Sequence, residues 1–460
     1  MDALIDRAQE RARLEAAWER ARKGRPQLVV VWGRRRVGKT FLLTHFLRGK
    51  RGVFYGATEQ AERVELGRLA EAVRRGLGVR ASELLGGAFS SWETALRALA
   101  ALAAEEPLVV VLDEVPYLTR STPGFASIVQ AVWDHSAPGT KLMLVLTGSA
   151  VGTMERLLGP GGALRQRPTE LMRLDPLGPV EARAFLPRLP PDAFLEAYAA
   201  CGGYPLHLRS WDASASTSEN LYRLGGSPGG ILLEDAAGIL REELPETGGY
   251  PRILAAIGRG RTRISEIANE AAQRVEHPLS VLIASGFVRR SVPIGAPRKA
   301  RPLYEIADPY LAFWFAVLYP DLPQIEGGQG RAVIRRASGR WARHVGWVFE
   351  EAARAHAARL VARGDLPEDL VVGRWWASAG EPCEVDVLGL RGSRTELLGE
   401  VRWTTRPLGL RELRELIAKT VRVPDPIDEP RYVLWGRKGV EDAVRSAGAL
   451  GFSVDDVLRP

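Results

Sequence analysis

The chain has 460 residues, of which 46% are hydrophobic and 26% charged, with a formal net charge of +8 and a pI of about 9.6. This length exceeds a single ordinary core and predicts two to four domains, and the composition excludes a fibrous or largely disordered chain. No apolar stretch approaches 18 residues, and the first residues lack a basic segment followed by an apolar one. We therefore expect neither a membrane span nor a signal peptide.

The two cysteines, Cys201 and Cys383, are too few for a disulfide framework or a zinc site, which predicts a cytoplasmic protein. Most of the positive charge comes from arginine, and five arginines are grouped in one short stretch: Arg331, Arg335, Arg336, Arg340 and Arg343. A basic surface is typical of nucleic-acid-binding proteins. Arginine richness can also reflect genome composition, so the net charge alone does not decide between the two interpretations.

Residues 33–40 read GRRRVGKT, a complete phosphate-binding loop between an apolar run at 27–32 and a helix start at 41–46. The glycines let successive N–H groups point at phosphate oxygens, and the helix that follows adds its positive end. We expect Lys39 to reach the β- and γ-phosphates of ATP and the Thr40 hydroxyl to bind Mg²⁺. The expected ATP-binding residues are Gly33, Arg34, Arg35, Arg36, Val37, Gly38, Lys39, Thr40 and Phe41.

A second apolar run, 107–112, ends in Asp113 and Glu114. We expect Asp113 to bind Mg²⁺ and Glu114 to activate the attacking water, which favours ATP hydrolysis over mere binding. A third run at 141–147 leads to Ser149, and either Ser149 or Thr147 is a candidate to sense the γ-phosphate at the carboxyl edge of a parallel sheet. The alternative interpretation of that segment is a simple turn.

Apolar runs alternate with amphipathic segments through this half of the chain, which predicts an α/β fold with a doubly wound parallel sheet. The expected strands are 27–32, 52–57, 107–113, 141–147 and about 171–175. The expected helices are 7–22, 39–48, 59–77, 92–105 and 124–136.

These motifs resemble the archaeal-type AAA+ ATPase family, which also occurs in bacteria. The resemblance rests on residues 33–40, on Leu112-Asp113-Glu114 and on Leu146-Thr147-Gly148-Ser149, and it extends to nearly the whole chain. Ile5-Asp6-Arg7 with Glu10 is similar to the family's leading box, although Asp6 replaces a glycine. Cys201-Gly-Gly-Tyr-Pro-Leu206 is similar to an element of its helical lid. The resemblance implies an ATPase core at 1–175 and a lid at 176–245.

The family often carries a P-L-Y-G-R motif after the sensor strand, where this chain reads Ala163-Leu-Arg-Gln-Arg167. Arg167 is the candidate arginine finger, with Arg165 as the second choice. Such a finger neutralises charge on the transferred phosphoryl group of a neighbouring subunit and implies a homo-oligomer. A surface arginine is the alternative interpretation.

Residues 246–325 predict a winged helix, with three short helices from Tyr250 to Gly286 and a hairpin formed by 287–292 and 301–306. The basic wing carries Arg289, Arg290, Arg298, Lys299 and Arg301. Its arginines favour phosphate contacts with double-stranded DNA, with weak sequence preference because the expected recognition helix has few base-reading side chains. A winged helix used only for packing is the alternative.

Residues 326–460 contain a hairpin with Asp386 on its first strand and Glu400 and Arg402 on its second. Together with Glu350 on a helix, the pattern resembles the PD-(D/E)xK nuclease core, which implies Mg²⁺ binding by Glu350, Asp386 and Glu400. Arg402 replaces the usual lysine and cannot act as a base, so cleavage is less expected than binding. Ordinary surface acids on a hairpin are the alternative.

The sequence as a whole predicts an ATP hydrolase that acts on DNA. A slow nucleotide-dependent switch that regulates partner proteins, with an inactive C-terminal domain, is the alternative.

Overall fold

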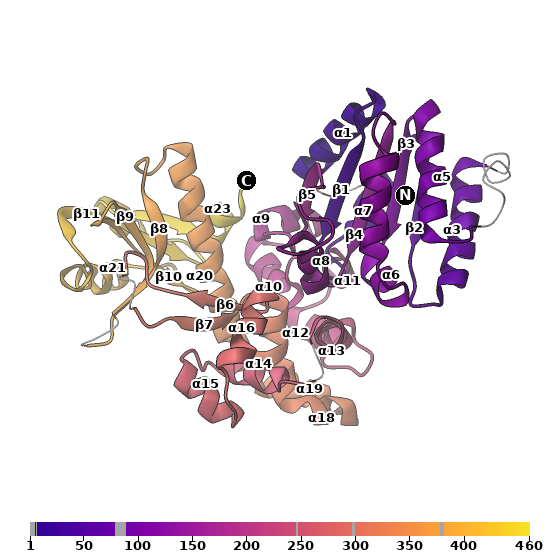
Figure 1. The fold of residues 1–460 in the computed structure, drawn as a ribbon. Helices are drawn as coiled ribbons and strands as arrows, with labels where there is room; N and C mark the ends of the chain where they lie inside the picture. Colours follow the sequence, from indigo (N-terminus) through magenta and orange to yellow (C-terminus); the bar gives the residue numbers. More distant parts are fainter. Residues whose placement is uncertain (1–4, 6, 79–88, 245–246, 297–299, 378–380) are drawn as a thin grey trace. The chain divides into compact units, whose positions relative to one another are not determined.

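The computed structural model describes residues 5, 7–78, 89–244, 247–296, 300–377 and 381–460. The chain divides into two compact units, residues 1–176 and 177–460 (Figure 1). Among the described helices, none is long and apolar enough to cross a membrane. The finer division of the chain into four domains stays a prediction.

The first unit is built on a five-stranded parallel sheet with the order β2-β3-β4-β1-β5 (Figure 1). Its strands are β1 (Gln27–Trp32), β2 (Gly52–Gly56), β3 (Leu108–Asp113), β4 (Leu142–Gly148) and β5 (Glu170–Arg173). Its described helices are α1 (Ala8–Arg22), α2 (Lys39–Phe46), α3 (Glu62–Leu77), α5 (Trp92–Glu105), α6 (Val115–Ser121), α7 (Phe125–Ser136) and α8 (Val151–Leu158). The predicted α/β fold class is confirmed.

Both faces of this sheet are buried, which explains why its strands read as continuous apolar runs. Leu28 and Val30 of β1 belong to a core formed with α3, α5 and α7, whereas the alternate residues Val29 and Val31 are equally buried on the other face. Helix α1 contacts β1 and β4. Helix α6 was not expected from the sequence, because it is short and begins directly after the acidic pair with Pro116 in its first turn.

The second unit begins with a helical region: α9 (Pro179–Ala182), α10 (Pro191–Cys201), α11 (Pro205–Ser210), α12 (Thr217–Gly225) and α13 (Ile231–Glu243). Three helices follow, α14 (Tyr250–Gly258), α15 (Ile264–Ala271) and α16 (Glu276–Ala284). Strands β6 (Val288–Ser291) and β7 (Leu303–Ile306) then pair antiparallel. These elements have the order that a winged helix requires.

Short helical segments, α17 (Pro309–Phe313), α18 (Leu322–Gln324) and α19 (Gly330–Arg336), lead to the long helix α20 (Ser338–Arg363). The final region is a mixed sheet with the order β12-β11-β10-β9-β8. Its strands are β8 (Val371–Trp376), β9 (Glu384–Arg391), β10 (Arg394–Arg402), β11 (Pro426–Gly436) and β12 (Leu450–Ser453). Helices α21 (Leu410–Ile417), α22 (Asp442–Ser446) and α23 (Val454–Leu458) complete the region.

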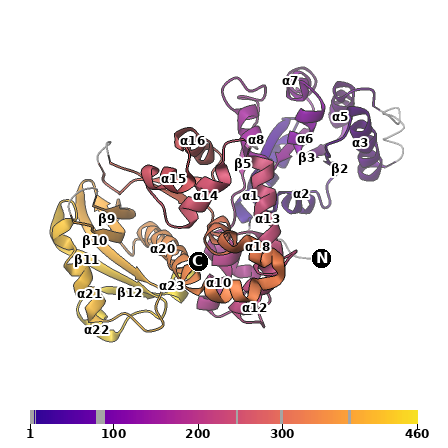
Figure 2. The same ribbon diagram turned by 90° about the horizontal axis from the view of Figure 1, so that it is seen from below.

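The antiparallel pairing of β9 with β10 forms the predicted hairpin. Helices α20 and α21 lie on opposite faces of its sheet (Figure 2). Leu388 and Leu398 pair across the hairpin and join a core with α21, while the Trp435 indole donates a 3.1 Å hydrogen bond to His356 of α20. The hairpin acids are therefore carried on a sheet that helices pack against from both sides.

Candidate functional site

The phosphate-binding loop lies between the end of β1 and the start of α2, as its sequence predicts. Gly38 has φ +97° at the start of α2, a conformation that side chains with a Cβ rarely adopt. A Cβ at Gly33 would lie 2.0 Å from the Leu174 carbonyl oxygen, so packing against the end of β5 requires that glycine. The buried Lys39 ammonium donates to the carbonyls of Gly33 and Arg34, at 2.7 and 3.0 Å, which closes the loop on itself.

Thr40 and Asp113 meet although 73 residues separate them. The Thr40 hydroxyl donates a 2.8 Å hydrogen bond to the Asp113 carboxylate at the end of β3. Burial raises the pKa of the Asp113 carboxyl, and the hydrogen bond from Thr40 opposes this rise. A hydroxyl and a buried carboxylate side by side are hard oxygen ligands of the kind that Mg²⁺ prefers.

Glu114 and Ser149 are joined across neighbouring strand ends. One oxygen of the Glu114 carboxylate accepts hydrogen bonds from the Ser149 amide at 3.0 Å and from its hydroxyl at 2.8 Å. The parallel pairing of β3 with β4 explains the contact, because both residues follow the carboxyl ends of paired strands. Glu114 itself has a left-handed backbone, with φ +61°, and its side chain is only partly buried. Thr147 lies fully buried on β4 next to β1.

Arg7 supports the phosphate-binding loop from outside. Its guanidinium donates to the Val37 carbonyl at 3.2 Å and to the Asp175 carbonyl at 2.6 Å, and it also pairs with Glu10 at 2.9 Å. The motif at the start of the chain indicated that Arg7 and Glu10 have a role, but it did not predict which groups they contact. Asp6 of that motif lies outside the described residues.

Arg167, the first candidate arginine finger, forms an ion pair within its own chain. Its guanidinium makes a bidentate ion pair with Asp134 of α7, with N–O distances between 2.9 and 3.1 Å. The second candidate, Arg165, is exposed two residues earlier in the same loop. Of the two side chains, Arg165 is the more exposed.

The predicted C-terminal acids, Glu350, Asp386 and Glu400, lie close enough to interact electrostatically. Burial raises the pKa values of Glu350 and Asp386, and repulsion between the two carboxylates raises the pKa of Glu350 further. The charge of Glu400 acts on Asp386 in the same way. Asp386 also accepts a 2.9 Å hydrogen bond from the Val401 amide. Among the described residues, no group of three or more His, Cys, Asp or Glu side chains is arranged to hold a metal ion. This conformation therefore gives no support to the prediction that Glu350, Asp386 and Glu400 bind Mg²⁺.

Lys419 is a residue of this region that sequence reasoning missed. Its ammonium lies 2.6 Å from one oxygen of the buried Glu400 carboxylate, and Arg402 contacts the other oxygen. The nuclease-core motif places its lysine two residues after Glu400 on the strand, whereas Lys419 follows helix α21. The only signal for Lys419 in the sequence was its position just after the helix that packs against the hairpin.

The predicted basic wing is partly neutralised. Arg289 makes ion pairs with Glu351 of α20 at 2.8 Å and with Glu305 of β7 at 3.3 Å, which corrects the expectation that it decorates a free surface. Arg290 and Arg301 are exposed. Arg298 and Lys299 lie outside the described residues.

Comparison with known proteins finds family models that match two regions of the chain. Residues 4–210 match a model described as an ATPase domain predominantly from Archaea. These residues therefore form an ATPase domain of the type that this model describes. Residues 314–416 match a second model, described as archaeal and bacterial proteins of unknown function. The predicted resemblance to archaeal-type AAA+ ATPases is thereby confirmed.

Proteins similar to the whole chain extend the comparison beyond the ATPase domain. An uncharacterized protein of Methanocaldococcus jannaschii is 27% identical over 469 residues, which cover 98% of this chain and 99% of that protein. The Walker-type ATPase of Pyrococcus abyssi superposes with a TM-score of 0.50 at 21% identity, over 68% of this chain and 96% of that chain, which shows a shared fold. The ORC2 protein of Aeropyrum pernix gives a TM-score of 0.45 at 14% identity, over 71% and 96% of the two chains.

Proposed function

We propose that the ATPase domain binds ATP with Mg²⁺ and hydrolyses it, and that the chain couples this turnover to double-stranded DNA. The observation that carries the proposal is the placement of the Thr40–Asp113 hydrogen bond beside Glu114, at the strand edge from which the phosphate-binding loop rises. A loop that only bound nucleotide would not require the second acid.

Each residue of the site has a distinct task in this proposal. Thr40 and Asp113 would hold Mg²⁺, which supplies charge neutralisation at the β- and γ-phosphate oxygens when it is bound. Lys39, which here closes the loop, would turn its ammonium to those phosphates. The loop amides from Gly33 to Phe41 would bind the remaining phosphate oxygens.

Glu114 is the proposed general base. Its carboxylate would accept a proton from the attacking water, and its two hydrogen bonds from Ser149 fix one of its oxygens while the other stays available. Ser149 is therefore proposed as a positioning residue that links the base to the end of β4. This assignment refines the predicted sensing role of Ser149.

The proposed DNA contact uses the exposed arginines of the hairpin. Arg290 and Arg301 lie on β6 and just before β7, and exposed guanidinium groups bind phosphate oxygens without reading sequence. Because Arg289 is neutralised by Glu351 and Glu305, we expect this contact to be weak.

Steady-state ATP hydrolysis with and without duplex DNA tests the proposal. We expect turnover that DNA stimulates and that Glu114→Gln abolishes while ATP binding persists. Absence of both DNA binding and turnover at low salt would refute it.

The alternative function is a slow nucleotide-dependent switch that regulates partner proteins. The ion pair between Arg167 and Asp134 favours it, because an arginine held within its own subunit does not complete a neighbour's site. This alternative predicts a large change in oligomeric state between ATP, ADP and nucleotide-free protein. An unchanged molar mass in light scattering under the three conditions would count against it.

A nuclease-like activity of the C-terminal region is a second proposal, favoured by the contact between Lys419 and Glu400. Lys419, just after helix α21, supplies the lysine ammonium that the motif expects at the position of Arg402 on strand β10. Asp386→Ala and Lys419→Ala should each remove any cleavage of duplex DNA while ATP turnover stays at the wild-type level. Cleavage that survives both substitutions would show that this cluster is not the site.

A further inference from the structure

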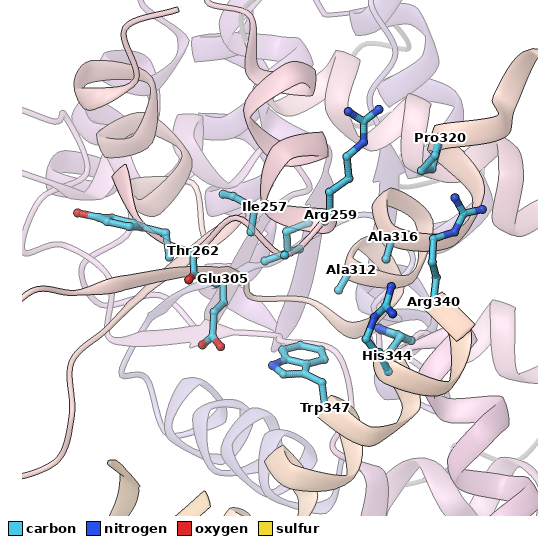
Figure 3. A pocket seen from close by; sticks show the side chains of 15 residues that line it. Ile257, Arg259, Thr262, Glu305, Ala312, Ala316, Pro320, Arg340, His344 and Trp347 are labelled. Carbon is cyan, nitrogen blue, oxygen red and sulfur yellow. The ribbon is translucent and has the colours of Figure 1, made fainter. Parts of the chain in front are cut away.

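A cavity of about 460 Å³ lies in the second unit between the end of α14, strand β7 and the first turns of α20 (Figure 3). The archaeal-type ATPase site does not contribute to it, because all its lining residues fall between 257 and 347. Pockets of this size hold small ligands in many proteins. Its position brings part of the arginine-rich stretch, Arg340 and Arg343, together with the turn that carries Arg259.

Part of the cavity lining is aromatic and aliphatic, and it includes Tyr304, Ile306 and the partly exposed Trp347. The Trp347 ring packs on His344, with ring centroids 5.9 Å apart, and His344 is held by the Ala199 carbonyl at 2.8 Å. Burial lowers the pKa of His344 to about 4, so its ring is neutral at pH 7. This wall offers a flat, uncharged surface against which a planar ring can stack.

Another part of the cavity lining is cationic. Figure 3 shows the Arg259 and Arg340 side chains reaching from the turn after α14 and from α20, away from the Trp347 indole. Arg259 shares Glu270 with Arg261, at 2.7 and 3.4 Å, and Arg340 shares Asp321 with Arg336. One carboxylate for two guanidinium groups leaves each cluster with net positive charge.

Arg343 adds an exposed guanidinium to this wall, and it has no ion-pair partner among the residues that the structure describes. The one acidic residue in the lining, Glu305, is already paired with Arg374 at 2.7 Å and with Arg289. The cavity therefore presents a net positive potential beside a flat aromatic surface.

We propose that this cavity binds a single nucleotide unit, with the base against Trp347 and the phosphate at Arg343 and its neighbouring arginines. An apolar ligand would leave the arginines without a partner, and inorganic phosphate would leave most of the volume and the aromatic wall unused. Arginine is suited to phosphate because its planar fork of donors matches two phosphate oxygens. The unit can come from a free mononucleotide or from a single-stranded nucleic acid, since both present the same base and phosphate.

The test uses the full chain carrying Lys39→Ala, which weakens nucleotide binding at the phosphate-binding loop, in buffer without divalent cations. Binding of dTMP is measured by calorimetry, and binding of fluorescein-labelled oligothymidylate by anisotropy. Arg343→Glu and Trp347→Leu are added separately to this background. Arg335→Glu is the matched control, because Arg335 is exposed in the same arginine-rich stretch but does not line the cavity.

We expect saturable binding that weakens roughly tenfold or more with Arg343→Glu and with Trp347→Leu, and that Arg335→Glu leaves unchanged. Binding of dTMP alone identifies a free nucleotide as the source, and binding of the oligonucleotide alone identifies a single strand. Equal losses in Arg343→Glu and Arg335→Glu, or no saturable binding of either probe, would overturn the proposal. If Trp347→Leu lowers the melting temperature, the comparison of the two arginine variants decides.

Discussion

At the scale of single residues, the hydrogen bonds from Ser149 to Glu114 are the contact most directly tied to chemistry. Ser149→Ala removes the hydroxyl donor but keeps the amide donor, so the carboxylate loses part of its orientation. We expect kcat for ATP hydrolysis to fall by about tenfold while KM for ATP is unchanged, because general-base catalysis depends on geometry.

Thr153→Ala is the control for this prediction. Its hydroxyl lies on α8, which follows the same strand, and it accepts a 3.0 Å hydrogen bond from Arg156 but, among the described residues, donates none to a carboxylate. Equal kcat values for wild type and Ser149→Ala would show that the serine does not position the base.

At the scale of secondary-structure elements, Arg7 fastens the start of α1 to the phosphate-binding loop and to the chain after β5. Arg7→Ala should leave the Val37 carbonyl without this donor and loosen the loop. We expect the Kd for ATP, measured by calorimetry, to rise by about three- to tenfold, which corresponds to the net contribution of about 1 kcal/mol of a typical hydrogen bond. Arg11→Ala, an exposed arginine on the same helix, should leave the Kd unchanged. A Kd that is also unchanged in Arg7→Ala would mean that the loop holds its shape without this contact.

A second link between elements joins the hairpin to α20 through Arg289 and Glu351. Burial alone would raise the pKa of Glu351, but hydrogen bonds from Arg289 and the charge of Arg354 lower it to about 2. A depressed carboxyl pKa stabilises the fold above the unfolded value of about 4.5, and this stability is lost as the pH falls toward 2.

Glu351→Gln should therefore lower the free energy of unfolding at pH 7 by about 1–3 kcal/mol, and the difference from wild type should shrink below about pH 4.5. Denaturant titrations at several pH values measure it. Glu415→Gln, which removes an exposed ion pair with Arg411, serves as the control. A difference that stays constant down to pH 3 would contradict the assigned cause.

The elements of the first unit could be predicted from the sequence because their information is local. Buried parallel strands read as apolar runs, and the loop at 33–40 carries its own turn and helix start. The contacts of Arg7 and of Lys419 could not be predicted, because they join segments far apart in sequence whose approach depends on tertiary packing. The pairing of Arg289 with α20 was missed for the same reason.

At the scale of the whole molecule, the excess positive charge should control the affinity with which the chain binds DNA. If binding is largely electrostatic, the logarithm of the association constant should fall linearly with the logarithm of the salt concentration. Replacing Arg290 and Arg301 by glutamine removes two exposed hairpin charges, so the slope should become shallower by about two units if both contact phosphate. The measurement is anisotropy of labelled duplex DNA across a salt series, with two unrelated sequences.

Glutamine at Arg74 and Arg97, two exposed arginines of the first unit, gives a control with the same loss of net charge. If the control and the hairpin variant change the slope equally, DNA responds to the overall charge and the hairpin has no special role. If only the hairpin variant changes it, and the two DNA sequences behave alike, the exposed arginines bind phosphate without reading bases. Sequence-dependent affinity would require base contacts from α16, whose polar side chains are only Glu276, His277 and Ser280.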